Sequence, residues 1–350
     1  MIDVGLIGYG LAGRSFHAPV IRAVPGLRLA AILQRSGNEA AEKYPDVRIV
    51  RTLDELLAIK EIRLVVIATP NDSHFSFAQQ CLAVGRDVLV DKPFTTTLAE
   101  ATALVEFAKK QGRLLTVYQN RRYDGDFQAI VKLVSSGALG RIVRFESNYD
   151  RFRPQLRPSA WRERPGPGTG IFFDIAPHLI DHALLLFGMP EALTADIRIE
   201  REGAVADDAF DLAFHYSRGL RADLRSSILA AATRPRFILH GTQGAFVKQS
   251  FDPQESNLRR GYIPSDTAWG AEPEENWGLL TLSENGALTE RRVPSSSCDY
   301  RDFYANLRDA ILGKAKLAVS PEWALNVMRL LELARQSSNE RRTISVPVTN

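Results

Sequence analysis

The sequence predicts an α/β fold, with an N-terminal domain built on a parallel sheet and a C-terminal α+β domain built on a large, mostly antiparallel open sheet. Before residue 123, continuous apolar runs alternate with helical patterns, which is typical of a parallel sheet covered on both faces. After it, apolar and polar residues alternate with a period of two, which indicates strands with one solvent-facing side. The 350 residues suffice for two domains, which we place at 1–122 and 123–350.

The individual elements follow from these patterns. Buried strands of the first domain are expected at 4–7, 29–33, 64–68, 88–90 and 114–118, with helices at 53–59, 75–84 and 98–111. The second domain is expected to begin with a helix at 125–135 and to contain strands at 142–149, 195–201, 209–216, 222–229 and 237–240. Further helices are expected at 175–186, 300–312 and 321–337, followed by a final strand at 343–348.

The composition argues against several classes of protein. A net charge of +3 gives no reason to expect a nucleic-acid or membrane partner. The longest apolar runs, such as 64–68, are too short to span a bilayer. The two cysteines, Cys81 and Cys298, form no CxxC pair, which argues against a disulfide scaffold or a zinc cluster. We therefore expect buried or half-buried thiols in a cytoplasmic protein.

A glycine-rich turn follows the first strand directly. Its residues are Gly8, Tyr9, Gly10, Leu11, Ala12 and Gly13, a GxGxxG pattern that opens a helix. In a Rossmann domain the first glycine allows the tight turn, the second lets the backbone approach a pyrophosphate, and the third lets helix and strand pack closely. The phosphates would lie on the N–H groups at the start of the helix. The pattern predicts dinucleotide binding; the alternative is a turn that is rich in glycine by chance.

The end of the second strand indicates which dinucleotide binds. Sites that prefer NAD carry an acidic residue there, which binds the ribose hydroxyls. Here the strand ends in Leu33-Gln34-Arg35-Ser36, and the first carboxylate is that of Glu39. Arg35 can hold a 2′-phosphate and Ser36 can donate a hydrogen bond to it. We therefore expect NADP, with NAD and a merely solvated Arg35 as the alternatives.

Two further positions carry candidate chemistry. Lys92 follows the fifth strand, at the edge where parallel strands face a ligand crevice, and can donate to a substrate oxygen. Asp174 and His178 are four residues apart and share one helix face. His178 is suited to proton transfer near neutral pH, and Asp174 can orient it or cap the helix, with Pro177 in the first turn. Considered alone, a surface lysine, a capping aspartate and a packed histidine are the simpler explanation.

Together these motifs resemble the Gfo/Idh/MocA family, which includes glucose–fructose oxidoreductase and inositol dehydrogenases. The shared features are the GxGxxG, the turn Thr69-Pro70-Asn71 followed by His74, the Lys-Pro at Lys92, and Asp174, His178 and Asp181 in an Asp-xxx-His-xx-Asp pattern. The stretches 13–19, 118–124, 151–155 and 161–163 further resemble NADP-dependent scyllo-inositol dehydrogenases and uncharacterised bacterial oxidoreductases close to them. The resemblance covers essentially the whole chain.

The resemblance implies a role for each residue. Lys92 corresponds to the lysine of the family's Glu-Lys-Pro, with Asp91 in place of Glu, and Asp174 and His178 correspond to its catalytic Asp and His. The cofactor is expected to contact residues 8–13, Arg35, Ser36, Thr69, Pro70, Asn71, His74, Lys92, Trp161 and Arg162. The substrate is expected to contact Lys92, Tyr118, Asn120, Arg121, Asp174 and His178. A homodimer or homotetramer assembled through the C-terminal sheet is also implied.

These assignments predict an oxidoreductase that moves a hydride between NADP(H) and a secondary alcohol or ketone of a sugar or inositol-like polyol, with no metal. His178 would remove the hydroxyl proton, Lys92 would stabilise the oxygen, and Asp174 would support the imidazolium. One alternative is a Rossmann protein that senses a nucleotide without turnover. The other is a metal-dependent hydrolase that uses His178, Asp181 and His182, whose spacing resembles HxxEH.

The segment 151–170 is rich in arginine and proline. Its five arginines, Arg151, Arg153, Arg157, Arg162 and Arg164, stand against a single carboxylate, that of Glu163. Repulsion among them would hold the segment open until an anion is present, which predicts a mobile flap. The anion would be the cofactor's phosphates or an acidic substrate; the alternative is a solvated loop without a function.

Overall fold

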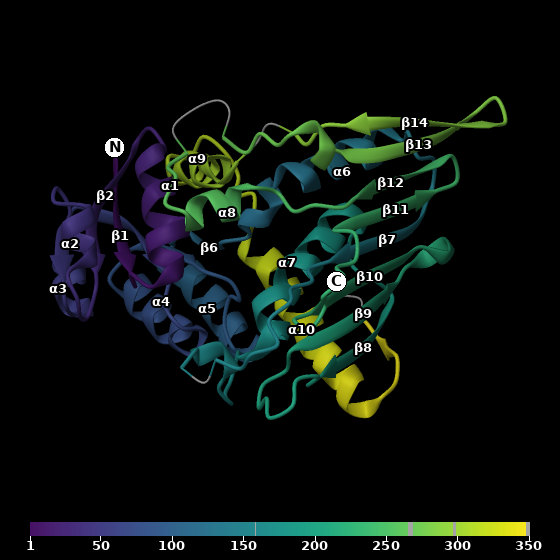
Figure 1. The fold of residues 1–350 in the computed structure, drawn as a ribbon. Helices are drawn as coiled ribbons and strands as arrows, with labels where there is room; N and C mark the ends of the chain where they lie inside the picture. The colour runs from purple at the N-terminus through teal and green to yellow at the C-terminus, as the bar shows by residue number, and fades with distance from the viewer. Residues whose placement is uncertain (158, 265–268, 297–298, 348–350) are drawn as a thin grey trace. The chain divides into compact units, whose positions relative to one another are not determined.

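The computed structural model describes residues 1–157, 159–264, 269–296 and 299–347. The chain forms two compact units. Figure 1 shows their helices and strands, coloured from purple at the N-terminus to yellow at the C-terminus. Unit 1 comprises residues 1–123, 253–269 and 299–325, and unit 2 comprises residues 124–252, 270–298 and 326–350. The division is therefore not a single cut after residue 122, because two later segments belong to the N-terminal unit.

The described part of unit 1 contains a six-stranded parallel sheet in the order β3-β2-β1-β4-β5-β6. Its strands are β1 (Ile2–Ile7), β2 (Leu27–Leu33), β3 (Arg48–Val50), β4 (Ile62–Ile67), β5 (Asp87–Val90) and β6 (Leu115–Val117). All residues of β1 and β5 are buried, as expected for a sheet covered on both faces. The predicted parallel sheet is confirmed; β3 was not predicted, because it has only three residues and only the last, Val50, is buried.

Helices surround this sheet. They are the π-helix η1 (Gly13–His17), α1 (Ala18–Ala23), α2 (Glu39–Lys43), α3 (Leu53–Leu57), η2 (Asn71–Ser73), α4 (His74–Ala83), α5 (Leu98–Gln111), η3 (Asn120–Tyr123), α8 (Gln254–Arg259) and α9 (Tyr300–Ile311). Local signals explain α5, since Thr97 and Glu100 form a capping box and Gly112 ends the helix with φ of 62°. The two helices from the C-terminal half of the chain pack on the first helices of the unit, α8 on η1 and α9 on α1.

The described part of unit 2 contains a nine-stranded, mostly antiparallel sheet in the order β14-β13-β12-β11-β7-β10-β9-β8-β15. Its strands are β7 (Ile142–Asn148), β8 (Ala192–Arg198), β9 (Ala209–His215), β10 (Arg221–Ser227), β11 (Phe237–Gly241), β12 (Gly244–Lys248), β13 (Gly278–Glu284), β14 (Ala287–Val293) and β15 (Ile344–Ser345). Only β7 and β10 pair in parallel among these described strands. The predicted open sheet is confirmed, although β12, β13 and β14 were missed and the predicted last strand reaches Val348, which lies outside the described residues.

Helices of unit 2 cover one face of this sheet. They are α6 (Gly125–Ser136), α7 (Gly170–Phe187) and α10 (Pro321–Glu340) from residue 326 onward. The short 3-10 turns η4 (Trp161–Glu163), η5 (Ser217–Gly219) and η6 (Glu274–Asn276) lie in connections. The long α7 packs against β9 and β10. Near the end of α10, Ser337 accepts the N–H of Ala195 in β8 at 2.9 Å. Buried side chains of β9, such as Phe210 and Phe214, therefore face the helices.

One helix among the described residues, α7, is long and apolar enough to cross a membrane, with a mean hydropathy of 1.4. Within the structure, however, 78% of it is buried, as in the core helix of a folded domain. The thiol of Cys81 is also buried, and burial raises its pKa to about 12. The second cysteine, Cys298, lies outside the described residues.

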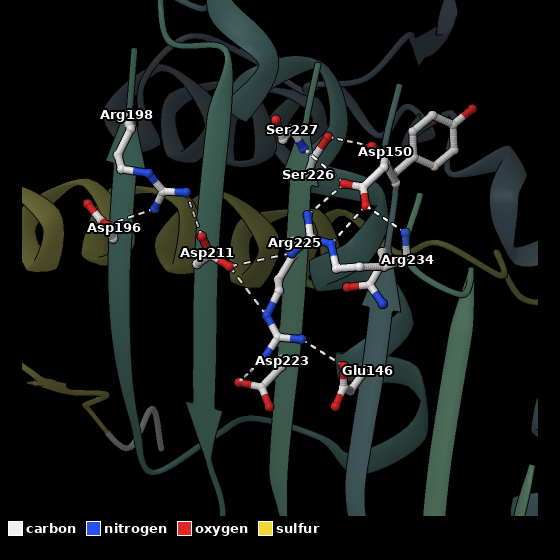
Figure 2. Close-up of polar contacts among 12 residues, drawn as sticks. Glu146, Asp150, Asp196, Arg198, Asp211, Asp223, Arg225, Ser226, Ser227 and Arg234 are labelled. Atoms are coloured by element: carbon white, nitrogen blue, oxygen red, sulfur yellow. Dashed lines mark hydrogen bonds and ion pairs between the residues drawn. The ribbon is translucent and has the colours of Figure 1, made fainter. Parts of the chain in front are cut away.

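The opposite face of the unit 2 sheet carries a ladder of alternating charges (Figure 2). Asp211 of β9 accepts from Arg198 of β8 at 2.8 Å and lies 3.3 Å from Arg225 of β10. Arg225 also donates to Glu146 of β7 at 2.7 Å. Side chains alternate along a strand, so these charges lie on the face away from the buried phenylalanines.

Candidate active site and family

The candidate nucleotide site of unit 1 lies at the carboxyl edge of its sheet. Because the described strands run parallel, the turns that follow β1, β2, β4 and β5 meet at this edge. The strand order changes direction between β1 and β4, which is where ligands bind in open sheets of this kind. The N–H of Gly8 donates to the carbonyl oxygen of Leu33 at 3.1 Å, which joins the glycine turn to the end of β2.

The three glycines of the turn have different surroundings. Gly8 has φ of +98°, and a Cβ there would lie 2.5 Å from the carbonyl oxygen of Ala68. A Cβ on Gly13 would lie 2.0 Å from the carbonyl oxygen of Gly8. In contrast, a Cβ on Gly10 would meet nothing within 4 Å among the described residues, and Gly10 is exposed. The turn therefore leaves open space where a pyrophosphate would approach, and the residues fit a dinucleotide.

The end of β2 carries the residues expected to choose the cofactor. Arg35 and Ser36 are both exposed. The loop that holds them is fixed by Arg51, whose guanidinium donates to the carbonyl oxygens of Gln34 at 2.7 Å and Gly37 at 2.8 Å. Glu39 accepts a hydrogen bond from the Gln34 amide, so the nearest carboxylate is engaged within the loop.

Arg14 was missed as a candidate cofactor residue. It is exposed in η1, and its charge acts to lower the pKa values of both Tyr9 and Glu39, so it lies near the glycine turn and the β2 loop. The signal in the sequence was an arginine immediately after the last glycine. Burial and the neighbouring Tyr44 nevertheless raise the pKa of Tyr9 to about 12, so its phenol stays protonated and able to donate.

The turn after β4 is held to the turn after β5 by His74. Its Nδ1 lies 2.9 Å from the carbonyl oxygen of Pro93, and its Nε2 lies 3.1 Å from that of Thr69. Burial lowers the pKa of this imidazole. Asn71 is also buried, whereas Pro70 is exposed. Within unit 1, the buried His74 therefore joins these two turns at the edge where the cofactor is expected.

Lys92 stands at the same edge, after β5. Its backbone N–H donates to Asp91 Oδ1 at 2.8 Å, and its peptide bond to Pro93 is cis. Lys92 is half-buried. One edge of the unit 1 sheet thus carries the expected cofactor residues of this unit: residues 8–13, Arg35, Ser36, the 69–74 turn and Lys92.

The expected substrate residues of unit 1 are mostly enclosed within it. Tyr118 is only 2% exposed, and its hydroxyl donates to the carbonyl oxygen of Phe16 at 3.1 Å. Arg121 is 9% exposed and forms an ion pair with Glu255. Asn120 begins η3 and is half-buried. Tyr118 and Arg121 therefore have packing and charge-pairing roles that the sequence did not reveal.

In unit 2, Asp174 and His178 lie on α7, but this helix begins at Gly170 rather than at the predicted residue 175. Asp174 is therefore not the N-cap, and Pro177 is not in the first turn; both expectations were wrong. The two side chains still share one helix face, since they are four residues apart within a continuous helix.

Asp207 explains the earlier start of α7. Its carboxylate accepts the N–H of Phe172 at 2.7 Å, and its carbonyl oxygen accepts that of Ile171 at 2.8 Å. Gly170 has φ of +85°, and a Cβ there would lie 2.3 Å from Asp207 Oδ1. Glycine at this position therefore lets Asp207 approach and satisfy the first N–H groups of the helix.

The carboxylate of Asp174 is held by arginines of the segment 151–170. Arg162 Nε lies 3.2 Å from Asp174 Oδ1, and a terminal nitrogen of Arg151 lies 3.8 Å from Oδ2. The Arg162 guanidinium also lies 4.4 Å from the ring centroid of Trp161. His178, one turn along α7, is 4% exposed. Trp161, Arg162 and Asp174 are thus brought together within unit 2.

The charges of this segment are better balanced than the sequence suggested. Arg157 donates to Glu163 at 2.8 Å, while Arg151 and Arg162 face Asp174. The buried Arg201 also lies 3.2 Å from Glu163. The expectation of five arginines against one carboxylate omitted Asp174, so simple repulsion does not describe the segment.

These side chains line a pocket of about 270 Å³ in unit 2. Its walls come from the segment 151–163, the start of α7 and the loop between β8 and β9, and include Arg153, Arg162, Asp174 and Asp207. Burial raises the pKa of Asp207. The pocket therefore brings Asp174 together with several cationic side chains.

The spacing of Asp181 and His182 has a packing explanation. Asp181 is 1% exposed, and the fully buried His182 stacks on Phe127, with ring centroids 3.8 Å apart and planes at 14°. In the part of the chain that the structure describes, no group of three or more His, Cys, Asp or Glu side chains is placed to hold a metal ion. Among these described residues, a metal bound by His178 and His182 would therefore lack the third protein ligand that the hydrolase alternative requires.

The sheet order, the glycine turn and the open space at Gly10 are those of a dinucleotide-binding fold, and the same chain also forms a second, open-sheet unit. Comparison with known families agrees: residues 2–119 match the NAD-binding Rossmann fold of an oxidoreductase family, and residues 131–348 match its C-terminal alpha/beta domain. The chain belongs to the Gfo/Idh/MocA family of oxidoreductases.

Relatives match over nearly their whole length. The chain is 42% identical to the uncharacterized oxidoreductase YdgJ of Escherichia coli, covering 98% of both chains. It is 37% identical to the NADP(+)-dependent scyllo-inositol 2-dehydrogenase IolW of Bacillus subtilis, covering 98% of this chain and 95% of the relative. The solved structure of the oxidoreductase yvaA of Bacillus subtilis matches with a TM-score of 0.95 at 37% identity, covering 99% and 98% of the two chains.

Proposed function

We propose that the chain is an NADP-dependent dehydrogenase or reductase that acts on a secondary alcohol or ketone of a sugar or cyclic polyol. The observation that carries the cofactor proposal is the carboxyl edge of unit 1, where Gly10 leaves space for a pyrophosphate and the exposed Arg35 stands where NAD-preferring sites carry a carboxylate. The name of the 37% identical relative supports both NADP and an inositol substrate.

Each candidate catalytic side chain has a role in this proposal. NADP, when bound, supplies the hydride acceptor. Lys92 donates a hydrogen bond to the substrate oxygen and stabilises its negative charge. His178 accepts the hydroxyl proton, and the Asp174 carboxylate, four residues earlier on α7, stabilises the resulting imidazolium. In reduction the same groups act in reverse.

Substrate screening tests this function. The purified protein is mixed with NADP or NAD and with inositols, aldoses and uronates, and the absorbance at the reduced cofactor's band is followed in both directions. We expect turnover with NADP and a polyol. A protein that binds NADPH tightly but turns over no member of the panel would instead be a nucleotide sensor.

We also propose that the chain forms a homodimer or homotetramer through the open face of the unit 2 sheet. The charge ladder of Figure 2 supports this, because Arg198, Asp211 and Arg225 satisfy one another on a face that the described helices of unit 2 leave uncovered. Paired charges are less costly to bury against a second copy than unpaired ones. Sedimentation of the wild type and of Asp211→Arg tests this: the substitution should shift the protein toward monomers.

A further inference from the structure

The proposed reaction does not use His17, although this histidine is fully buried in unit 1. It is the last residue of η1, a π-helical turn that follows the glycine turn directly. Single π-helical turns are rare and occur often at functional sites. The contacts of this buried imidazole indicate what it does.

The His17 ring lies between two ionisable groups. Its Nδ1 lies 2.6 Å from the hydroxyl oxygen of Tyr304, which α9 supplies from the other end of the chain. Its Nε2 lies 3.6 Å from Asp91 Oδ2. The ring also packs against Tyr118, with centroids 4.4 Å apart. The imidazole therefore connects α9 to the turn after β5.

Asp91 carries this connection to the candidate catalytic lysine. Its side chain is 14% exposed, and its second oxygen, Oδ1, accepts the backbone N–H of Lys92 at 2.8 Å. Burial acts to raise the pKa of Asp91, but the imidazole of His17 and the charge of Lys92 together hold it below its ordinary value. A carboxylate only accepts hydrogen bonds, so a proton on Nε2 of His17 would face Asp91 across 3.6 Å, while Nδ1 can accept from the Tyr304 hydroxyl at 2.6 Å.

We propose that His17 is a positioning residue for Lys92: it holds the Asp91 carboxylate in place, and the Tyr304 hydroxyl fixes the orientation of its ring. The Asp91 carboxylate in turn fixes the Lys92 backbone and keeps a negative charge beside its ammonium group. The link to turnover rests on the proposed function, but the effect on Lys92 itself does not. Among the described residues, His74 of α4 and Tyr118 are further ionisable groups near Asp91 and His17.

Removal of the imidazole should act on Lys92 in a defined direction. In His17→Phe, the Asp91 carboxylate loses the imidazole nitrogen that lies 3.6 Å from it and becomes free to move away from the Lys92 ammonium group. A weaker neighbouring negative charge stabilises the ammonium form less, so Lys92 should titrate at a lower pH than in the wild type. His17→Gln, whose amide can donate toward Asp91, should restore part of the difference.

The main experiment measures Lys92 without any substrate. The lysines are reductively methylated with ¹³C-formaldehyde, the Lys92 signal is assigned by its loss in Lys92→Arg, and its pH midpoint is determined by NMR. We expect a midpoint lower by roughly half a pH unit or more in His17→Phe, a smaller shift in Tyr304→Phe, and partial recovery in His17→Gln. Tyr304→Phe removes one oxygen only, so it keeps the proposal testable if His17→Phe does not fold.

Phe303→Leu is the matched control, since Phe303 packs on Tyr118 in the same cluster, with centroids 4.9 Å apart. It should lower thermal stability and leave the Lys92 midpoint unchanged. With NADP and scyllo-inositol, His17→Phe should lower kcat by about tenfold and leave NADPH affinity within about twofold.

Equal Lys92 midpoints in wild type, His17→Phe and Tyr304→Phe would overturn the proposal and leave His17 as a packing residue. A shifted midpoint in a protein that turns over no substrate would support the inference while the proposed function fails. Unchanged Lys92 midpoints in a protein that does oxidise scyllo-inositol would overturn the inference about His17 and support the proposed function.

Discussion

Gly13 packs directly against Gly8: a Cβ on Gly13 would lie 2.0 Å from the Gly8 carbonyl oxygen, a distance no real Cβ tolerates. Gly10 lies between them in the sequence, yet a Cβ there would meet nothing within 4 Å in the described structure. The protein's own packing therefore requires the last glycine, whereas any requirement for Gly10 must come from something that binds in front of it.

This difference predicts opposite effects of two alanine substitutions. Gly13→Ala should lower the free energy of unfolding by about 1–3 kcal/mol, because the new methyl group forces helix and strand apart. Gly10→Ala should leave the melting temperature of the cofactor-free protein unchanged and weaken NADPH binding by roughly tenfold or more, since the methyl group occupies the approach to the pyrophosphate. Thermal melts and NADPH fluorescence titrations measure both. Unaltered NADPH affinity in Gly10→Ala would place the cofactor elsewhere.

Arg35 should determine the choice between NADP and NAD. Arg35→Asp replaces an attractive charge on the 2′-phosphate with a repulsive one and should weaken NADP binding by about 2–3 kcal/mol. NAD affinity should change far less, because NAD lacks that phosphate. Dissociation constants of both cofactors, for wild type and variant, test this. A wild-type protein that binds NAD more tightly than NADP would contradict the assignment.

Lys92→Ala and His178→Ala should each lower turnover strongly. A positioned acid or base contributes about 10²–10⁴-fold in rate. NADPH affinity should stay nearly intact, because both side chains are assigned to the reacting carbon rather than to the phosphates. His178→Ala should also flatten the acidic limb of the pH profile for oxidation, since a protonated imidazole cannot accept the proton. Full activity of either variant with the true substrate would remove that residue from the mechanism.

Substitutions of Arg162 and Arg157 distinguish two roles for the segment 151–170, binding of the cofactor and recognition of an acidic sugar. Arg162 faces Asp174 at 3.2 Å and Arg157 donates to Glu163 at 2.8 Å, so both are ion-paired within unit 2. If Arg162 contacts the cofactor, Arg162→Ala should weaken NADPH binding by roughly tenfold, about 1.4 kcal/mol, whichever substrate is used. Arg157→Ala serves as the control and should leave NADPH affinity within about twofold. A loss confined to uronate turnover in Arg157→Ala would instead indicate that the segment recognises an acidic sugar.

The sequence predicted those parts of the fold whose signals are local. The apolar runs of β1 and β4, the glycine turn and the Lys92 turn are each contained in a few consecutive residues. The start of α7 was misplaced because its capping carboxylate, Asp207, stands 35 residues after the N–H that it accepts. The strand β14 was missed because it is almost wholly exposed and so lacks alternation.

Long-range partners set the rest of the candidate site. His17 and Tyr304 are 287 residues apart, and no pattern near His17 in the sequence indicates that it contacts α9. Arg121, likewise, pairs with Glu255 from α8, a segment that sequence patterns assigned to the other domain. Motif spacing therefore identified the candidate catalytic and cofactor residues. The side chains that contact and support them could be identified only from the tertiary structure.

Asp150 and Arg234 form the pair in unit 2 whose pH dependence is easiest to predict. The Asp150 side chain is 1% exposed and accepts from Arg234 at 2.6 and 2.8 Å and from the N–H of Ser227 at 3.1 Å (Figure 2). Burial acts to raise the pKa of Asp150, but these bonds and the charge of Arg234 outweigh it and hold the pKa below its ordinary value.

A depressed carboxyl pKa stabilises the folded state above the pKa of the unfolded chain, about 3.9, and this stabilisation is lost as the pH falls through the lower folded value. Asp150→Asn should therefore lower the free energy of unfolding by about 2 kcal/mol at pH 7, a value moderated because Arg234 is 35% exposed. The gap between wild type and variant should narrow below about pH 4 as wild-type Asp150 becomes protonated. Asp196→Asn is the control, since Asp196 is 65% exposed and pairs with Arg198 of the charge ladder, and the substitution should cost less than about 1 kcal/mol. Urea unfolding from pH 3 to pH 7 measures both differences; a constant gap for Asp150→Asn across that range would show that its carboxylate is not ionised in the folded state.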